Sequence, residues 1–170
     1  SKMKIGNGWK LNLMQSMIAA NNGDGEDVYI YTDANGSQIV LEQCNKDQEG
    51  AVNSSCNLIT DTGSCNKYTY GEKCEIVYDS ATRIMTIKND AKYFFDLSGR
   101  LIKISDKNGN EMIITYTNGR ITSVTDGVDR EFIFSYSGNY LTSITAPDDT
   151  VITYSYSGSQ LTSVTYPDGR

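Results

Sequence analysis

Residues 111–130 read EMIITYTNGRITSVTDGVDR, residues 131–150 read EFIFSYSGNYLTSITAPDDT, and residues 151–170 read VITYSYSGSQLTSVTYPDGR. These segments are one unit of 20 residues written three times. A fixed period in this range is typical of an array in which each unit buries surface only against its neighbours. The residues that recur at equal intervals are Tyr116, Tyr136 and Tyr156, then Ile121, Leu141 and Leu161, then Val124, Ile144 and Val164.

One copy of the unit has the pattern of a β-hairpin followed by a turn. Every second residue of Glu131–Tyr136 is aromatic, and such alternation predicts a strand. Ser137–Asn139 is a short break that contains glycine, and Tyr140–Thr145 is a second strand-like run. Pro147–Asp149 is a turn before the next copy begins. Three copies therefore predict three consecutive antiparallel hairpins.

The first strands of the hairpins predict one continuous apolar and aromatic face, opposite a more polar face. Such a sheet suits an open, curved surface better than a closed sandwich core. In the second strands, Leu141 and Ile144 lie three residues apart, so regular pleating would put them on opposite faces. Either both faces are partly covered there, or a bulge lies near Thr142 and Ser143. The predicted core of the repeats comprises Tyr116, Ile121, Val124, Phe134, Tyr136, Leu141, Ile144, Tyr154, Tyr156, Leu161 and Val164.

The runs Tyr116–Asp126 and Tyr154–Arg170 resemble the YD repeats of the Rhs family, which also occur in bacterial wall-associated proteins, toxin-complex shells and teneurins. The resemblance implies an all-β fold of consecutive antiparallel hairpins in a curved open sheet. In the family, such hairpins wind into a hollow β-cocoon around a C-terminal toxic or signalling segment. The chain is thus expected to be an N-terminal piece of the repeat shell of a longer protein.

The chain departs from the family pattern after the repeat tyrosine. Thr117, Ser137 and Ser157 stand where the family has aspartate. The tyrosine–aspartate pair occurs at Tyr78-Asp79, and Phe95-Asp96 is a near match. We expect that aspartate to form a turn, so its replacement changes the local turn type more than the fold.

The resemblance extends to the start of the chain. Gly6–Leu13 alternates apolar and polar residues and is similar to the segment that opens the family's shell. Met14–Ala20 suits a short helix or a strand, and the resemblance favours a strand. Val28–Thr32 and Ser37–Glu42 predict a hairpin that matches one of the family.

The middle of the chain predicts short strands of less regular spacing. Phe95–Asn110 is a degenerate unit, because Leu101 and Ile104 stand one period before Ile121 and Val124. We therefore divide the chain into opening strands (1–43), an insertion (44–74) and repeat hairpins (75–170). The further strands expected are Tyr68–Tyr70, Glu75–Tyr78, Arg83–Lys88, Lys92–Asp96 and Arg100–Ser105.

The insertion contains all the cysteines of the chain: Cys44, Cys56, Cys65 and Cys74. Four cysteines in one polar segment allow two disulfides with three possible connectivities. Free thiols and a zinc site are the alternatives, although zinc usually needs a closely spaced cysteine pair. Disulfides would imply an extracellular setting.

Composition and charge limit the possible functions. The chain has 170 residues, a net charge of −6, a pI near 4.6 and a mean hydropathy of −0.43. Lysine and arginine are scattered singly, which disfavours nucleic-acid binding. No apolar run approaches the ~20 residues of a membrane span. The resemblance to Rhs and wall-associated proteins implies a secreted or cell-surface bacterial protein.

Catalytic and cofactor chemistry finds little support in the sequence. There is no histidine, which removes Ser-His-Asp and Cys-His nucleophile systems. Asp24–Asp27, Asp33–Gly36 and Asp106–Glu111 resemble calcium loops, but such segments are usually turns. Adjacent carboxylates such as Asp148 and Asp149 cannot face each other across a glycosidase cleft. We therefore expect neither an enzyme nor a bound cofactor or metal.

We consider two functions. The first is the structural one that the resemblance implies: the repeats enclose a toxin, with the rest of the same polypeptide as the partner. The second is an adhesin-like module that stacks cell-surface glycan on Tyr116, Tyr136 and Tyr156. Exposed sheet edges also predict edge-to-edge self-association of the chain.

Overall fold

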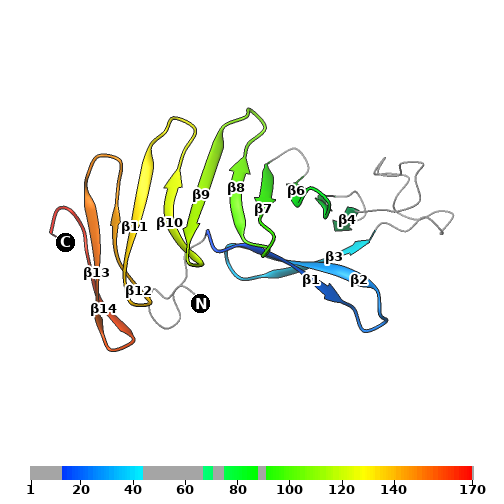
Figure 1. Ribbon diagram of the computed structural model, residues 1–170, viewed down its shortest axis with the longest axis horizontal. Helices are drawn as coiled ribbons and strands as arrows, with labels where there is room; N and C mark the ends of the chain where they lie inside the picture. The colour runs from blue at the N-terminus through cyan, green and yellow to red at the C-terminus, as the bar shows by residue number, and fades with distance from the viewer. Residues whose placement is uncertain (1–12, 44–66, 71–74, 88–90, 170) are drawn as a thin grey trace. The chain divides into compact units, whose positions relative to one another are not determined.

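The computed structural model describes residues 13–43, 67–70, 75–87 and 91–169 (Figure 1). All regular structure in these residues is β-strand, which confirms the predicted all-β class of consecutive antiparallel hairpins. The residues fall into two compact units, one within Asn12–Gly109 and one within Asn110–Arg170. Each unit is described separately.

The first unit is a sheet whose strands follow one another in chain order, each antiparallel to its neighbour. The region predicted as a helix or strand, Met14–Ala20, is a strand. The hairpin predicted from Val28–Thr32 and Ser37–Glu42 is also present. The strands are β1 (Ser16–Asn21), β2 (Asp27–Thr32), β3 (Gln38–Gln43), β4 (Lys67–Tyr70), β5 (Ile76–Asp79), β6 (Ile84–Ile87), β7 (Lys92–Phe95) and β8 (Leu101–Ser105).

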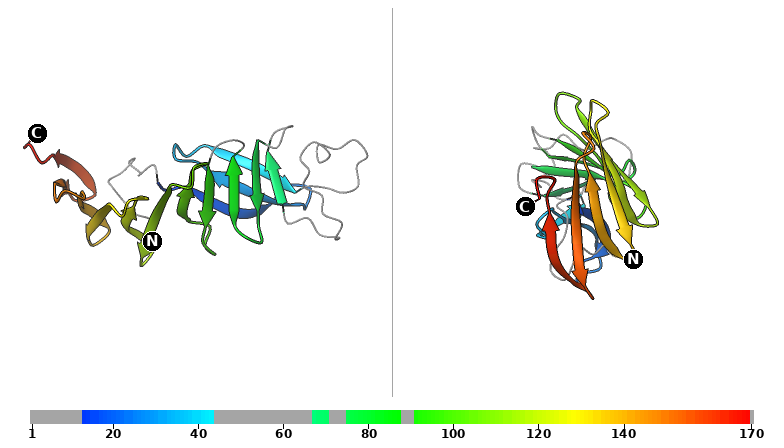
Figure 2. Two further views of the ribbon diagram at one scale, coloured as in Figure 1. Left: turned by 90° about the horizontal axis from the view of Figure 1, so that it is seen from above. Right: turned by 90° about the vertical axis from the view of Figure 1, so that its left-hand side faces the viewer.

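The sheet of the first unit folds over on itself. Figures 1 and 2 show β1, β2 and β3 passing across β4 to β8. Tyr29 of β2 packs its ring 4.6 Å from that of Tyr68 and 4.8 Å from that of Tyr78. Tyr31 packs 6.4 Å from Phe95 in an edge-to-face arrangement. The apolar face of the opening strands is therefore covered by the later strands of the same sheet.

The start of β1 is hydrogen-bonded to the turn between β7 and β8. The Met17 N–H donates to the Gly99 carbonyl at 2.8 Å, and the Leu101 N–H donates to the Gln15 carbonyl at 3.3 Å. These contacts fasten the two ends of the folded sheet. The core beneath them consists of Met17, Val28, Tyr31, Leu41, Tyr68, Ile76, Tyr78, Met85, Ala91, Phe95 and Leu101.

The second unit is a sheet of three consecutive hairpins, one for each copy of the 20-residue unit. Two-residue breaks join the strands of each hairpin, and five-residue turns join one hairpin to the next. The strands are β9 (Glu111–Thr117), β10 (Arg120–Thr125), β11 (Glu131–Ser137), β12 (Tyr140–Thr145), β13 (Val151–Ser157) and β14 (Gln160–Thr165).

Each second strand of a repeat contains a bulge, as the spacing of Leu141 and Ile144 suggested. Tyr136 pairs with Leu141 while Ser135 pairs with Ser143, so Thr142 is the extra residue. The bulge lets Leu141 and Ile144 both lie opposite the aromatic residues of β11, on one face. The same shift occurs at Thr122 in β10 and at Thr162 in β14.

The degenerate repeat predicted at Phe95–Asn110, which lies in the first compact unit, has the same bulge. Phe95 pairs with Leu101 and Phe94 pairs with Lys103, so Ile102 is the extra residue. Leu101 is fully buried, as Leu141 is in the regular repeats. Phe95–Asn110 thus shares the bulge and the buried leucine of the regular repeats, although a longer break separates β7 from β8.

Several predictions differ from the structure or lie outside the described residues. The strand expected to begin at Arg83 begins at Ile84, because Arg83 has a φ of 58° and belongs to the preceding turn. The opening strand Gly6–Leu13 lies outside the described residues except for its last position. Cys44, Cys56, Cys65 and Cys74 also lie outside them. The division into 1–43, 44–74 and 75–170 stays a prediction.

Candidate functional site

The most regular feature of the repeats is a hydrogen bond from a tyrosine to the preceding hairpin. The Tyr136 hydroxyl donates to the Ile121 carbonyl at 2.7 Å, and the Tyr156 hydroxyl donates to the Leu141 carbonyl at 2.8 Å. The acceptor is in each case the residue just before the bulge, where the ladder between strands is interrupted. The repeat tyrosine therefore fastens its own hairpin to the one before it.

A side chain from the preceding hairpin covers the ring of each of these tyrosines. The guanidinium of Arg120 lies 5.6 Å from the centroid of the Tyr136 ring. The Tyr140 ring lies 4.9 Å from that of Tyr156, tilted by 43°. Arg120 also donates to the carbonyl of Gly138, at the tip of the next hairpin. Positions 120 and 140 are one period apart. The packing of their side chains on the tyrosine ring of the next hairpin is therefore a second contact that repeats between hairpins.

The environment keeps the hydroxyl of Tyr136 protonated. Burial raises the pKa of Tyr136 to about 12, although the nearby Arg120 guanidinium opposes this rise. Burial also raises the pKa of Tyr156 and of Tyr154. A raised pKa preserves the hydrogen-bond donor at neutral pH. Among these three side chains, none is poised to act as a base near pH 7.

The bulge threonines satisfy backbone groups that the bulge leaves open. The Thr142 hydroxyl donates to the Ser135 carbonyl at 3.1 Å. The Thr122 hydroxyl lies 3.4 Å from the Thr115 carbonyl. Unpaired backbone carbonyls in a sheet are costly, so a hydroxyl at this position stabilises the bulge. This gives a physical reason for threonine at the bulge position of the first two copies.

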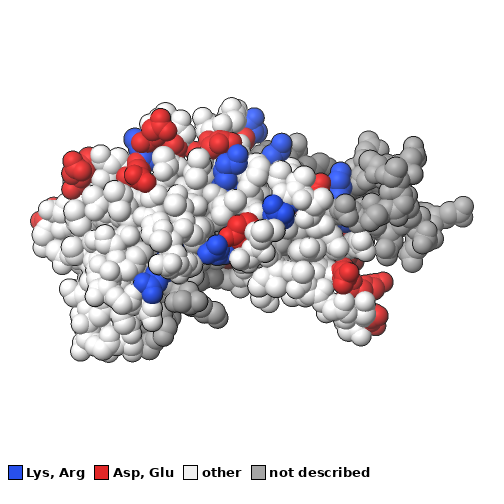
Figure 3. Space-filling view, viewed as in Figure 1, with Lys and Arg blue, Asp and Glu red and all other residues white. Residues whose placement is uncertain are grey.

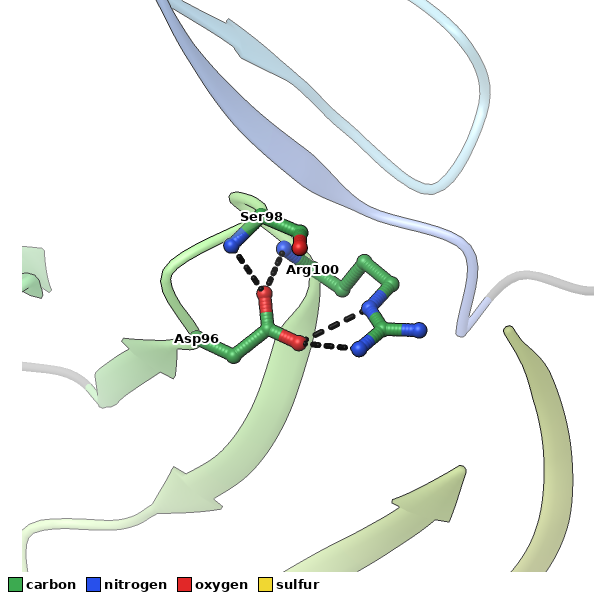
Figure 4. Close-up of polar contacts among 3 residues, drawn as sticks. All are labelled: Asp96, Ser98 and Arg100. Carbon is green, nitrogen blue, oxygen red and sulfur yellow. Dashed lines mark hydrogen bonds and ion pairs between the residues drawn. The ribbon is translucent and has the colours of Figure 1, made fainter. Parts of the chain in front are cut away.

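The aspartate of the family's tyrosine–aspartate pair forms a turn, as expected. Asp79 accepts the N–H groups of Ala81 and Thr82 at 3.0 and 3.2 Å. Asp96 accepts the N–H groups of Ser98 and Arg100 at 2.8 and 3.0 Å (Figure 4). Its second oxygen pairs with the Arg100 guanidinium at 2.6 Å. These carboxylates close turns and do not point at a shared centre.

Electrostatics reinforce the turn at Asp96. Burial alone would raise the pKa of Asp96, but the hydrogen bonds from Arg100 and Ser98 outweigh it and hold that pKa below its usual value. Asp126 forms the same turn with Val128 and Arg130, and the Arg130 guanidinium lowers the pKa of Asp126. Both carboxylates are ionised at neutral pH and bind their own turns.

The segments that resemble calcium loops use their oxygens in the same way. Glu26 and Asp27 accept the side-chain amides of Asn22 and Asn21 at 2.9 and 3.1 Å. Asp33 accepts the N–H groups of Asn35 and Ser37. In the later loop, Asp106 accepts the Asn108 N–H at 2.8 Å. Asp148 binds the Thr150 N–H and hydroxyl. The ranges that the structure describes hold no group of three or more His, Cys, Asp or Glu side chains arranged for a metal ion.

Acidic side chains are concentrated in the turns that join one hairpin of the second unit to the next. Figure 3 shows acidic atoms along the upper edge, where Figure 1 places these turns. The hairpin tips at Asn118-Gly119, Gly138-Asn139 and Gly158-Ser159 are uncharged, apart from the neighbouring Arg120. The acidic residues in and beside these turns are Asp126, Asp129, Glu131, Asp148 and Asp149, and Arg130 in the same region pairs with Asp126.

The predicted core residues lie on one face of the second unit, with burial that declines along the array. Ile121 is 1% exposed and Leu141 is 0% exposed, whereas Leu161 is only partly buried. Val124 and Phe134 are buried. The partly buried members of the set are Tyr116, Tyr136, Ile144, Tyr154, Tyr156, Leu161 and Val164.

Sequence reasoning missed the role of Arg120 and Tyr140. Both are the first residue of a second strand, directly before its first apolar residue. A signal was therefore present, because the same repeat position holds a large side chain in both copies. Their target is the tyrosine of the following hairpin, 16 residues further along the chain. A comparison of repeat positions alone does not reveal which ring such a side chain covers.

Comparison with known proteins gives one result that bears on this site. A family model described as RHS Repeat matches residues 134–170, which span the last two hairpins from Phe134 onward. A search of curated proteins found no match. The described part of the chain also holds no helix with the length and apolar character of a membrane span.

Proposed function

Because this chain carries RHS repeats, also called YD repeats, we propose that it is a wall segment of a hollow β-shell. The shell belongs to a larger secreted protein of the Rhs and wall-associated type, and it encloses a C-terminal toxin segment. The partner of this segment is the rest of the same polypeptide. Its setting is outside the bacterial cell or on its surface.

The observation that carries the proposal is the repeated fastening of each hairpin to the one before it. Tyr136 and Tyr156 make the same bond to the preceding hairpin, one period apart. Such links let a sheet grow by one hairpin at a time without a second layer of structure. A wall of this kind separates its two sides and needs no reactive group, which agrees with tyrosines and carboxylates that are occupied internally.

The test uses the complete protein encoded by the gene. Electron microscopy of that protein is expected to show a closed particle with residues 111–170 in its wall. Limited proteolysis should leave the C-terminal segment intact until the particle is opened by denaturant. A solid or extended particle, or a C-terminal segment cleaved as fast as an unfolded chain, would refute the proposal.

A carbohydrate-binding module is the alternative, and exposed aromatic side chains favour it. Phe132 is 41% exposed and Tyr166 is 49% exposed. Tyr116, Tyr136 and Tyr156 are less accessible, and the last two already use their hydroxyls within the sheet. A glycan array with the wild-type chain and the Tyr166→Ala variant tests this function. Binding that depends on the Tyr166 ring would favour it, and absence of retention at low salt would remove it.

The disulfide proposal is kept for Cys44, Cys56, Cys65 and Cys74. Two disulfides in the insertion agree with the proposed extracellular setting. Thiol titration of the denatured chain, with and without reductant, should find four thiols only after reduction. Four thiols without reductant would overturn both the disulfides and this argument for the compartment.

A further inference from the structure

A cavity lies in the first unit, where β6 ends and β7 begins, beside the turn that follows β8. Its volume is about 670 Å³, and its lining includes Thr86, Ile87, Lys92, Ser105 and Lys107. A cavity of this size falls within the range of small-molecule sites in proteins. It is separate from the repeat tyrosines and their bonds, so its role is a separate question.

The strand register places three polar side chains in a row beside this cavity. Lys92 lies opposite Thr86 on one neighbouring strand and opposite Ser105 on the other. Residues paired in this way have Cβ atoms about 5 Å apart. Met85 is fully buried on the inner face of the sheet, so the alternation of β6 puts Thr86 and its partners on the outer face. One ammonium group is thus flanked by two hydroxyl groups on an outer surface.

The turn after β8 supplies a second cation. The Asp106 carboxylate accepts the Asn108 N–H at 2.8 Å, and the Asp106 carbonyl accepts the Gly109 N–H at 3.2 Å. Lys107 lies within this closed turn, so its backbone is held beside the cavity. The Asp106 carboxylate also lines the cavity, but its hydrogen bond directs one oxygen into the turn. The lining therefore carries two ammonium groups against one carboxylate.

Neither lysine is neutralised by a partner. Lys92 and Lys107 are exposed and form no ion pair with a carboxylate of the described residues, whereas Arg100 is paired with Asp96. The chain as a whole has a net charge of −6, so two unneutralised cations at one cavity run against its general charge. Figure 3 shows Lys and Arg atoms in the part of the view where Figure 1 places β7 and β8. A local excess of positive charge beside a cavity attracts an anion.

The residue types indicate which anion fits. A carboxylate is held best by the planar fork of an arginine, whereas lysine binds a phosphate group as a point charge. The lysines and hydroxyls of this cavity are four separate donors without a fork, which suits the several oxygens of a phosphate group. The cavity is also larger than a phosphate group alone requires. It therefore has room for the alcohol to which a phosphate is esterified.

We propose that this cavity binds a phosphate ester of a small polyol. The phosphate lies between the ammonium groups of Lys92 and Lys107 and accepts from the hydroxyls of Thr86 and Ser105. The polyol part occupies the remaining space, beside Ile87. This site is independent of the wall function, because it uses a different surface and none of the repeat tyrosines.

The experiment follows the backbone amide signals of the isotope-labelled chain by NMR during titration with glycerol phosphate at low ionic strength. Titration with inorganic phosphate tests whether the polyol part contributes, and succinate tests whether any dianion of similar size is sufficient. The variants Lys92→Gln and Lys107→Gln each remove one cation from the cavity. The matched control is Lys103→Gln, which removes the same charge from β8 at a position outside the cavity lining.

The expected result is a set of saturable shifts at Lys92, Ser105 and Lys107. Each cavity variant should weaken the binding of glycerol phosphate about 5-fold, because one exposed ion pair is lost, and Lys103→Gln should leave the affinity unchanged. Unchanged amide signals in the other strands show that the variants remain folded.

Three results would overturn the proposal. Shifts spread over the whole chain, or equal weakening by Lys103→Gln, would mean that only general charge attracts the anion. Equal affinity for succinate would refute the recognition of phosphate. Equal affinity for inorganic phosphate would refute a site for the ester.

Discussion

Replacement of Gly99 by alanine tests the contact that fastens the folded sheet of the first unit. Gly99 has a φ of 73° and accepts the Met17 N–H at 2.8 Å. A Cβ atom on Gly99 would overlap the carbonyl oxygen of Met17 and come within 3.0 Å of its carbonyl carbon. Both atoms are backbone, so the start of β1 must move away from the turn.

The cost follows from the bonds that this movement breaks. The left-handed backbone conformation costs an alanine about 1–2 kcal/mol. Loss of the hydrogen bonds between Met17 and Gly99 and between Leu101 and Gln15 adds about 1 kcal/mol each. We expect Gly99→Ala to lower the free energy of unfolding by about 3–4 kcal/mol, of which only the first part is due to backbone strain.

Gly109→Ala is the matched control. Gly109 has a φ of 85°, but no atom lies within 4 Å of the position that its Cβ would take. It therefore shares the backbone strain without the collision, and it should cost about 1–2 kcal/mol. Urea denaturation followed by circular dichroism gives both values, and hydrogen exchange at Met17 reports the bond directly. Equal destabilisation by the two variants, or unchanged exchange at Met17 in Gly99→Ala, would refute the reasoning.

Three further outcomes are expected. Tyr136→Phe removes the hydroxyl donor to the preceding hairpin and should cost about 1–2 kcal/mol in urea denaturation; an unchanged midpoint would contradict the role of that bond. Leu141→Ala should cost about 2–5 kcal/mol because the side chain is fully buried, while Leu161→Ala should cost less than half as much, and the reverse order would be inconsistent with the burial of the array. Because burial raises the pKa of Tyr78 and Tyr136 from 10.0 to about 12, their contribution to stability is complete below pH 10 and is lost as the pH rises toward 12. Denaturation midpoints that stay constant from pH 9 to pH 12 would argue against buried, protonated tyrosines.

Much of the fold could be predicted because the responsible interactions are local or repeat at a fixed interval. Alternation of aromatic and polar residues in Glu131–Tyr136 is sufficient to identify a strand. The three-residue spacing of Leu141 and Ile144 left two possibilities, two partly covered faces or a bulge, and the register of β11 and β12 shows the bulge. The aspartates at 79 and 96 were recognisable as turn formers because they bond to N–H groups two to four residues away.

The links between hairpins were harder to predict. Periodicity shows that Tyr136 and Tyr156 have equal roles, but the acceptors at Ile121 and Leu141 become apparent only once the bulges set the register. The function of Arg120 depends on the same register, because its guanidinium reaches a ring in another hairpin. These residues form a site only through pairing between strands.

The amino-acid sequence by itself determined that this protein is a series of hairpins, since each hairpin is specified within about 20 residues of chain. Only the tertiary structure decided that the first sheet folds over and bonds Gln15–Met17 to Gly99–Leu101. Those segments lie more than eighty residues apart, and the sequence of neither segment indicates that the two pair. The physical reason is that a strand edge accepts any backbone of suitable shape. Which backbone it meets depends on the cumulative twist and packing of all the strands between them.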